Sequence, residues 1–155
     1  TMGYISKVVQ EQGETRTILG RRVKFEEWVP TARRKEGESA PVPVDLETAY
    51  MMWGSQIKRA DSYKGLNYVI QGSAADLMKA AMVMCYEQGI FDVTGIPSLV
   101  VHDELDFEVA EQTDDVHKAF EEMVNVMQTA IPFRVPVRVA GEWGMNWSDL
   151  EDIAV

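Results

Sequence analysis

Residues 99–109, LVVHDELDFEV, constrain the fold of this 155-residue chain more than any other stretch. Strand-forming apolar residues stand on both sides of a short polar break, which predicts two strands, over about 97–102 and 104–109, joined by a tight junction. The break consists of His102, Asp103 and Glu104. Ionised carboxylates are costly to bury without a partner, so we expect this pair of acids at the edge of a sheet.

Two interpretations of the acid pair stay open on spacing alone. Neighbouring carboxylates raise each other's pKa unless a cation is present, and a hard divalent ion such as Mg²⁺ prefers carboxylate oxygens. Acid-rich turns are also common in hairpins that bind nothing. The spacing by itself favours the plain turn, and a metal site is the alternative.

Turn and capping signals divide the rest of the chain into helices and short strands, which predicts an α+β fold. In chain order we expect a helix over 3–12 ended by Gly13, a hairpin of 15–19 and 23–25, a loop over 28–44, a helix over about 46–60 capped by Asp45, a helix over about 67–88 closed by Gly89, a helix over about 114–130 capped by Thr113, and a strand over 135–140.

Apolar residues at helical spacing predict the core. Trp143 and Trp147 are expected as packing anchors near the C-terminus, whereas Asp106 and Glu108 alternate with apolar neighbours and are expected to face solvent or an open edge. His117 receives no role. The expected core residues are Met78, Met82, Met84, Met123, Met127 and Cys85.

The length suits one domain, and charge is distributed unevenly along it. The net charge is −10, which as a whole argues mildly against nucleic-acid binding. Residues 1–65 nevertheless carry a net +2, and residues 66–155 carry −12. We therefore expect a locally basic first part and an acidic second part, which can be a solvated surface, a magnesium site or both.

A single cysteine excludes an internal disulfide and fits a reducing compartment. The sequence holds no apolar run of about 18 residues, so no membrane partner is expected. Together these features predict a cytoplasmic location, or the host cytoplasm if the protein is viral.

Four motifs, in this order along the chain, resemble family A DNA polymerases, the DNA polymerase I type. TILGRR at 17–22 resembles the Gly-Arg-Arg hairpin of that family, and LNYVIQGSAADLMKAAM at 66–82 is similar to the helix that follows its fingers. VHDELDFEV at 101–109 is similar to its third signature motif, and GMNW at 144–147 resembles its C-terminal ending. The combination is much more specific than any one motif.

The resemblance implies the C-terminal portion of a right-hand polymerase palm, an antiparallel sheet with packed helices, plus the base of the fingers. Residues 1–65 would then form a basic hairpin, loop and helix. Residues 66–155 would form the palm portion that carries the catalytic carboxylates. Such a piece belongs to a split or phage-like polymerase.

The resemblance also implies the chemistry. A complete site of this family holds two Mg²⁺ ions and adds deoxynucleoside triphosphates to the 3′ end of a primer paired with template DNA. Asp103 is then a catalytic metal ligand, and Glu104 is an acidic neighbour with a weaker or indirect part. His102 would support the primer end.

Amide and basic residues complete the implied DNA contacts. Asn67 and Gln71 are four apart, so they share one helix face and can reach the minor groove, although alone they favour a solvated face. Lys64 stands next to Tyr63, which replaces an arginine of the family. The basic candidates for phosphate contacts are Arg21, Arg22, Lys58 and Arg59.

Each basic candidate has a plainer alternative. Arg21 and Arg22 could pair with Glu26 and Glu27 on the surface. Lys58 and Arg59 would be favourable at a helix C-terminus in any case. The basic run 33–35 lies in the long loop, where a solvated charge run is the favoured interpretation.

The family site needs a second aspartate and a nucleotide-binding fingers helix, and neither pattern occurs in this sequence. We therefore expect an N-terminal polymerase polypeptide as a partner. One alternative is a catalytically silent DNA-binding or assembly module that retains the palm fold. A metal-dependent phosphohydrolase is a weaker alternative, because its usual His and Asp clusters are missing.

Overall fold

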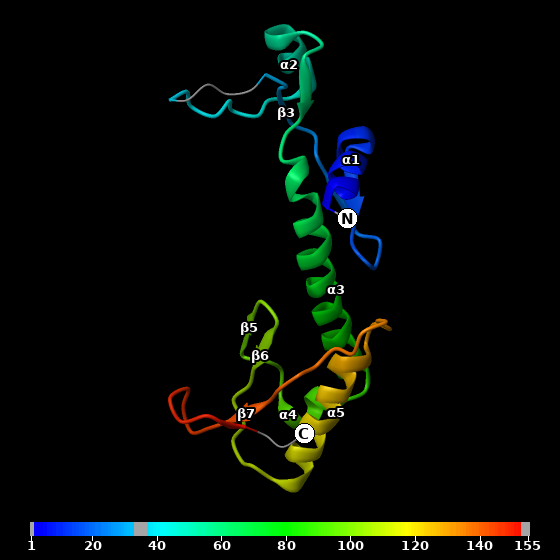
Figure 1. Ribbon diagram of the computed structural model, residues 1–155. Coiled ribbons are helices and arrows are strands. Elements are labelled where there is room, and N and C mark those ends of the chain that lie inside the picture. The colour runs from blue at the N-terminus through cyan, green and yellow to red at the C-terminus, as the bar shows by residue number, and fades with distance from the viewer. Residues whose placement is uncertain (1, 33–36, 153–155) are drawn as a thin grey trace. The chain divides into compact units, whose positions relative to one another are not determined.

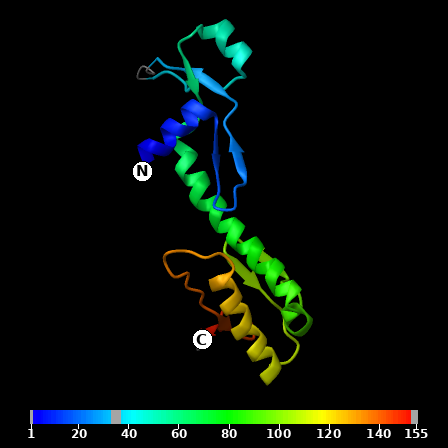
Figure 2. The same ribbon diagram turned by 90° about the vertical axis from the view of Figure 1, so that its right-hand side faces the viewer.

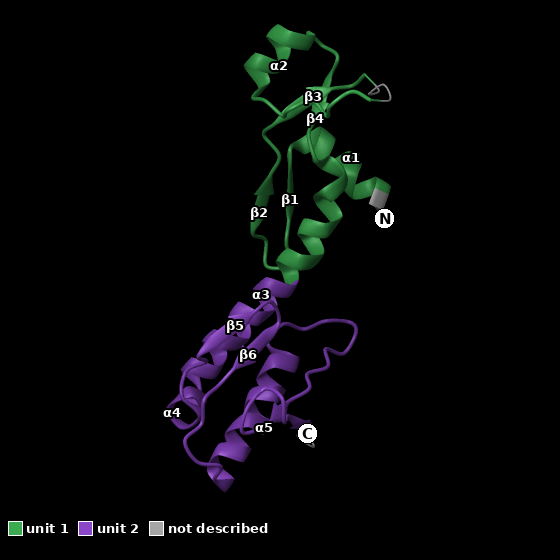
Figure 3. Cartoon of the chain, turned by 90° about the vertical axis from the view of Figure 1, so that its left-hand side faces the viewer, with its two compact units in different colours: residues 1–73 green, residues 74–155 purple. Residues whose placement is uncertain are grey.

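The computed structural model describes residues 2–32 and 37–152 (Figure 1). The chain divides into two compact units, residues 1–73 and 74–155 (Figure 3). The boundary falls inside helix α3 (Gly65–Glu87). Helices combine with antiparallel two-stranded sheets, which confirms the predicted α+β class. The charge-based division after residue 65 stays a prediction.

Unit 1 is built around helix α1 (Met2–Gln12) and the first part of α3. Gly13 ends α1 with a positive φ of 75°, as its sequence position predicts. The predicted hairpin follows, with β1 (Glu14–Arg16) antiparallel to β2 (Arg22–Lys24). Figures 1 and 2 show this hairpin beside α3.

The middle of unit 1 differs from the prediction. The expected loop over 28–44 begins with strand β3 (Trp28–Pro30), which pairs antiparallel with β4 (Ile57–Arg59). The expected helix over 46–60 is wrong beyond α2 (Leu46–Trp53), because Gly54 ends the helix at a φ of 60° and the chain then enters β4. The Asp45 cap is confirmed, since its carboxylate accepts the Thr48 N–H at 3.0 Å.

The 3-10 helix η1 (Ser62–Lys64) leads from β4 into α3. Val9 of α1 is fully buried, and a side chain on Gly65 would place its Cβ 2.8 Å from Val9 Cγ2. A glycine at this position therefore allows α1 to pack closely on the start of α3. Phe25, Ala49 and Ala60 are the other buried apolar residues described in this unit.

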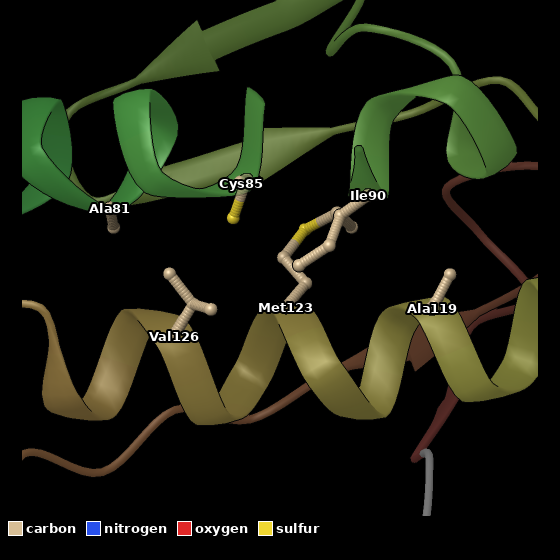
Figure 4. Packing of buried hydrophobic residues seen from close by; sticks show 6 residues of the cluster. All are labelled: Ala81, Cys85, Ile90, Ala119, Met123 and Val126. Atoms are coloured by element: carbon tan, nitrogen blue, oxygen red, sulfur yellow. The ribbon is translucent and has the colours of Figure 1, made fainter. Parts of the chain in front are cut away.

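Unit 2 holds the remainder of α3, the short helix α4 (Ile90–Thr94) and helix α5 (Asp114–Thr129). The predicted cap is confirmed, because the Thr113 hydroxyl accepts the Val116 N–H at 3.3 Å. These helices enclose one apolar cluster, shown in Figure 4. Its buried members are Ala81, Cys85, Ile90, Ala119, Met123 and Val126.

The predicted core is confirmed for Cys85, Met78 and Met123, which are buried. Met84 and Met127 pack against the cluster while partly buried. Burial also raises the pKa of the Cys85 thiol.

Four short strands complete unit 2: β5 (Leu99–Val101) with β6 (Glu104–Asp106), and β7 (Glu142–Trp143) with β8 (Glu151–Asp152). The strand predicted over 135–140 is wrong, since no strand is formed there. Pro136 has no N–H to donate to a ladder. Trp143 packs on Phe120 with ring centroids 5.1 Å apart, as predicted, but the packing role predicted for Trp147 is wrong, because this side chain is 76% exposed.

None of the helices in the described part of the chain is long and apolar enough to span a membrane.

Candidate functional site

The acid pair lies at a tight hairpin junction, as predicted, with Asp103 in the turn and Glu104 at the start of β6, although both strands are shorter than predicted. Val101 pairs with Glu104, so His102 and Asp103 alone form the connection between β5 and β6. His102 has a φ of 54°, in the left-handed region that few residues other than glycine adopt. A two-residue hairpin turn requires a positive φ at its first residue, so this φ follows from the turn, and the turn is a candidate site because of its carboxylates.

The side chains of this turn face solvent. His102, Asp103 and Glu104 are all exposed, and the Ser98 N–H donates to the Asp106 carbonyl at 2.8 Å to extend the ladder at the far end of the hairpin. The apolar strand beside them is exposed too, with Leu99, Val100 and Val101 at 43%, 46% and 40%. The hairpin therefore offers both carboxylates and an uncovered apolar strand to other groups.

The donor set of the turn fits a hard cation. Mg²⁺ commonly binds one or two carboxylates and keeps several waters, and Asp103 and Glu104 provide two adjacent carboxylates in an exposed position. Within the described residues, no group of three or more His, Cys, Asp or Glu side chains could hold a metal ion. The turn by itself therefore offers two carboxylates.

The amide pair lies in unit 1, on the first turns of α3. Asn67 and Gln71 are both exposed, so the predicted accessible face is present. Lys64, just before the helix, forms an ion pair with Asp61 at 3.1 Å. Hydrogen bonding to that carboxylate raises the pKa of Lys64.

The two hairpin arginines have different partners. Arg22 Nε lies 3.0 Å from Glu14 Oε2, across the strand pair and not at the predicted Glu26 or Glu27. Arg21 Nη2 donates to the Gly72 carbonyl of α3 at 2.9 Å. Arg22 is therefore a surface ion pair, whereas Arg21 ties the hairpin to the helix.

Lys58 and Arg59 lie in strand β4, which corrects their predicted place at a helix C-terminus. Lys58 is exposed, but the guanidinium of Arg59 is engaged within unit 1. It donates to the Phe25 carbonyl at 2.7 Å and to the Gln10 carbonyl at 3.3 Å, and lies 4.4 Å from the Trp28 ring centroid. This environment is that of a structural arginine.

The structure thus gathers the amide and basic candidates in unit 1 and the acidic turn in unit 2. Arg33, Arg34 and Lys35 lie outside the described residues. The sequence reasoning gave no role to Gln10, Thr17, Gly72 and Ser73, which make the contacts that hold unit 1 together. A glycine inside a helical pattern is the one signal that could have pointed to Gly72.

Comparison with known proteins finds one matching family and several relatives of similar sequence. The family model "DNA polymerase family A" matches residues 2–149. The chain is 32% identical over 150 residues to DNA polymerase I of Rhizobium leguminosarum, which covers 92% of this chain and 12% of that protein. DNA polymerase I of Mycobacterium leprae is 31% identical over 150 residues, which is 93% of this chain and 14% of the relative.

A phage protein is also similar. The DNA-directed DNA polymerase of Pseudomonas phage M6 is 40% identical over 86 residues, which is 56% of this chain and 11% of that protein. The chain thus spans only a small fraction of the length of each of these relatives.

Proposed function

This chain belongs to DNA polymerase family A, and on that premise we propose that it forms part of a template-directed DNA polymerase. Its relatives are named DNA polymerases, which supports the activity class. The observation that carries the proposal is the exposed Asp103-Glu104 pair at the hairpin junction between β5 and β6. In this proposal the chain contributes the acidic side of the catalytic centre.

Asp103 and Glu104 are the residues that would hold Mg²⁺, on which family A polymerases generally depend. The bound ions would supply charge neutralisation for the primer 3′-oxygen and the triphosphate, the usual contribution of a two-metal site. Asp103 is the principal ligand in the proposal, and Glu104 has the weaker part. His102 lies beside them and supports the primer end.

The residues of unit 1 would hold the DNA. Asn67 and Gln71 present exposed amides, which can donate to minor-groove acceptors common to all base pairs and so suit an enzyme that copies any sequence. Arg22, Lys58 and Lys64 lie at or near the surface as cations for phosphate. A phosphate role for Arg21 and Arg59 stays a prediction, since both guanidinium groups already donate to backbone carbonyls.

The remaining parts of the centre would come from an N-terminal polymerase polypeptide outside this sequence, joined to it or separate. Within the described residues the turn provides two carboxylates and no third acidic, imidazole or thiol ligand, which is consistent with this part of the proposal. The partner would supply the second aspartate and the helix that binds the incoming deoxynucleoside triphosphate. The location of the protein stays a prediction, in the cytoplasm or the host cytoplasm.

Asp103→Ala in the assembled polymerase tests the function. We expect primer extension to fall by at least about a thousandfold, because a group that acts on the transition state is lost. DNA affinity should change by less than roughly threefold, since it comes from many phosphate contacts. Glu104→Ala should reduce extension less than Asp103→Ala.

Asp106→Ala is the matched control, an acid on the same hairpin that has no proposed role. It should extend primers like the parent. Near-normal extension by the Asp103 variant would contradict the metal assignment. A parent that binds primer-template but never extends it would instead favour the silent module.

A further inference from the structure

The turn of the first hairpin, residues 17–21, is seated directly on helix α3. Arg21 Nη2 donates to the Gly72 carbonyl at 2.9 Å, and the Ile18 N–H donates to Ser73 Oγ at 3.0 Å. A Cβ at position 72 would lie 2.7 Å from Thr17 Cγ2, so the glycine permits the close approach. Two hydrogen bonds and one close approach thus join one turn to two consecutive helix residues.

The turn is itself well ordered by internal bonds. The Arg21 N–H donates to Thr17 Oγ1 at 3.1 Å, the Thr17 N–H to the Arg21 carbonyl at 3.0 Å, and the Gly20 N–H to the Thr17 carbonyl at 2.9 Å. Thr17 is 5% exposed although it lies in a hairpin turn. Because the hydroxyl of this buried residue is hydrogen-bonded, Thr17 fixes the conformation of the turn.

The contacts lie on the side of α3 away from the amide pair. Residues in an α-helix are about 100° apart around the axis, so Gly72 and Ser73 point away from the face shared by Asn67 and Gln71. Ser73 Oγ also donates to the Val69 carbonyl at 2.6 Å, and Val69 lies midway in sequence between the two amide residues. The turn therefore supports the helix from behind the face that the proposed function gives to DNA.

We propose that the hairpin turn 17–21 positions Gln71 and Asn67 for the primer terminus, and that Arg21 is a positioning residue and not a phosphate contact. This inference rests on the proposed polymerase function and refines it. Arg21 Nη2 donates to the carbonyl of Gly72, the residue that directly follows Gln71. Losing this bond lets the helix shift at the amide pair, and DNA charge neutralisation is unaffected.

Arg21→Met, with Arg22→Met as the matched control, separates the two roles in the assembled polymerase. A phosphate contact contributes about 0.9 to the slope of log affinity against log salt. We expect Arg21→Met to leave that slope unchanged and Arg22→Met to lower it. Extension from a matched primer end should fall roughly tenfold in Arg21→Met, the effect of one hydrogen bond from a charged donor, with altered discrimination against mismatched ends.

The variant Asn67→Ala/Gln71→Ala provides the test of coupling. If Arg21 acts through the amide pair, adding Arg21→Met to this variant should slow extension no further, because both sets of changes remove one function. An additional, multiplying loss on adding Arg21→Met would overturn the proposal, as would a lower salt slope with unchanged mismatch discrimination in Arg21→Met.

A steric pair tests the same contact without touching an arginine. Gly72→Ala should displace the turn, lower the melting temperature and reproduce the mismatch phenotype of Arg21→Met. Adding Thr17→Ser removes the Cγ2 methyl group that the new Cβ would strike and keeps the hydroxyl that Arg21 N–H needs, so the double variant should recover both properties. Absence of recovery would overturn the seating of the turn.

Primer extension by the parent enzyme distinguishes a failure of the proposed function from a failure of this inference alone. A parent without primer extension would overturn the proposed function and this inference together. An active parent whose Arg21 and Gly72 variants keep normal mismatch discrimination would overturn this inference alone.

Discussion

The two units are stabilised in different ways. In unit 1, polar side chains join segments far apart in sequence: Gln10 donates to the Arg59 carbonyl and accepts the Arg59 N–H, and Arg21 reaches Gly72. In unit 2, an apolar cluster between α3, α4 and α5 joins the segments instead. The acidic turn of this unit lies on an exposed hairpin.

The difference matters for function. The amide residues assigned to DNA stand on a helix that its own unit fixes by hydrogen bonds. The carboxylates proposed for catalysis lie on a hairpin of unit 2. Among the described residues, no third acidic or imidazole ligand joins them, and the residues of β5 beside them are exposed. In the proposed function, unit 1 would therefore contribute residues for DNA binding, and unit 2 would contribute two carboxylates to a site that other groups complete.

Met123→Ala should have the largest effect on stability. The side chain is 3% exposed in the centre of the unit 2 cluster, so its loss should reduce the free energy of unfolding by about 2–5 kcal/mol through lost burial and a cavity. Urea titration measures the change. Met51→Ala is the control, since Met51 is 75% exposed and its loss should change stability by less than about 0.5 kcal/mol. Equal losses of stability in the two variants would contradict the conclusion that the apolar cluster stabilises unit 2.

Arg59→Met should weaken unit 1 by a smaller amount, about 1–3 kcal/mol. The variant keeps the apolar stem but loses the bonds to the Phe25 and Gln10 carbonyls and the contact with the Trp28 ring. Hydrogen exchange should quicken in α1 and β4, while that in α5 should be unchanged. Lys58→Met, at the exposed neighbouring position, should leave stability unaltered. An Arg59 variant as stable as the parent would show that the polar links are dispensable.

Asp45→Asn should have the smallest effect on stability, and this effect should depend on pH. Hydrogen bonds from Thr48 lower the pKa of its carboxyl below the ordinary 3.8, so the charged form is favoured in the folded chain. The stabilisation is present above pH 3.8 and is lost as pH falls through the lower folded value. Asp45→Asn retains a capping oxygen without charge, so its difference from the parent at pH 7 should shrink on acidification. A pH-independent difference would contradict the assignment.

Local signals in the sequence predicted much of this architecture. The caps at Asp45 and Thr113 and the stop at Gly13 are confirmed because a cap depends on residues three or four positions away. The acidic turn was predicted for the same reason, since strand alternation and a polar break specify a hairpin within a dozen residues.

Contacts between distant residues could not be predicted. Strand β4 replaced the end of a predicted helix because Ile57–Arg59 pair with Trp28–Pro30, a partner nearly 30 positions earlier. The bond from Arg21 to Gly72 spans 51 positions and has no local pattern. The site residues were therefore found by composition and resemblance, whereas the contacts that position them required the structure.

Primer extension by the 155-residue chain, alone and with the N-terminal polymerase polypeptide, tests the central claim most directly. Because the residues that the structure describes add no third acidic, imidazole or thiol ligand to the turn, and because strand β5 is exposed, we expect the chain alone to extend no primer. Adding the N-terminal polypeptide should restore extension and raise the melting temperature, since binding to the folded form stabilises it. Robust extension by the chain alone would contradict both the incomplete site and the need for a partner.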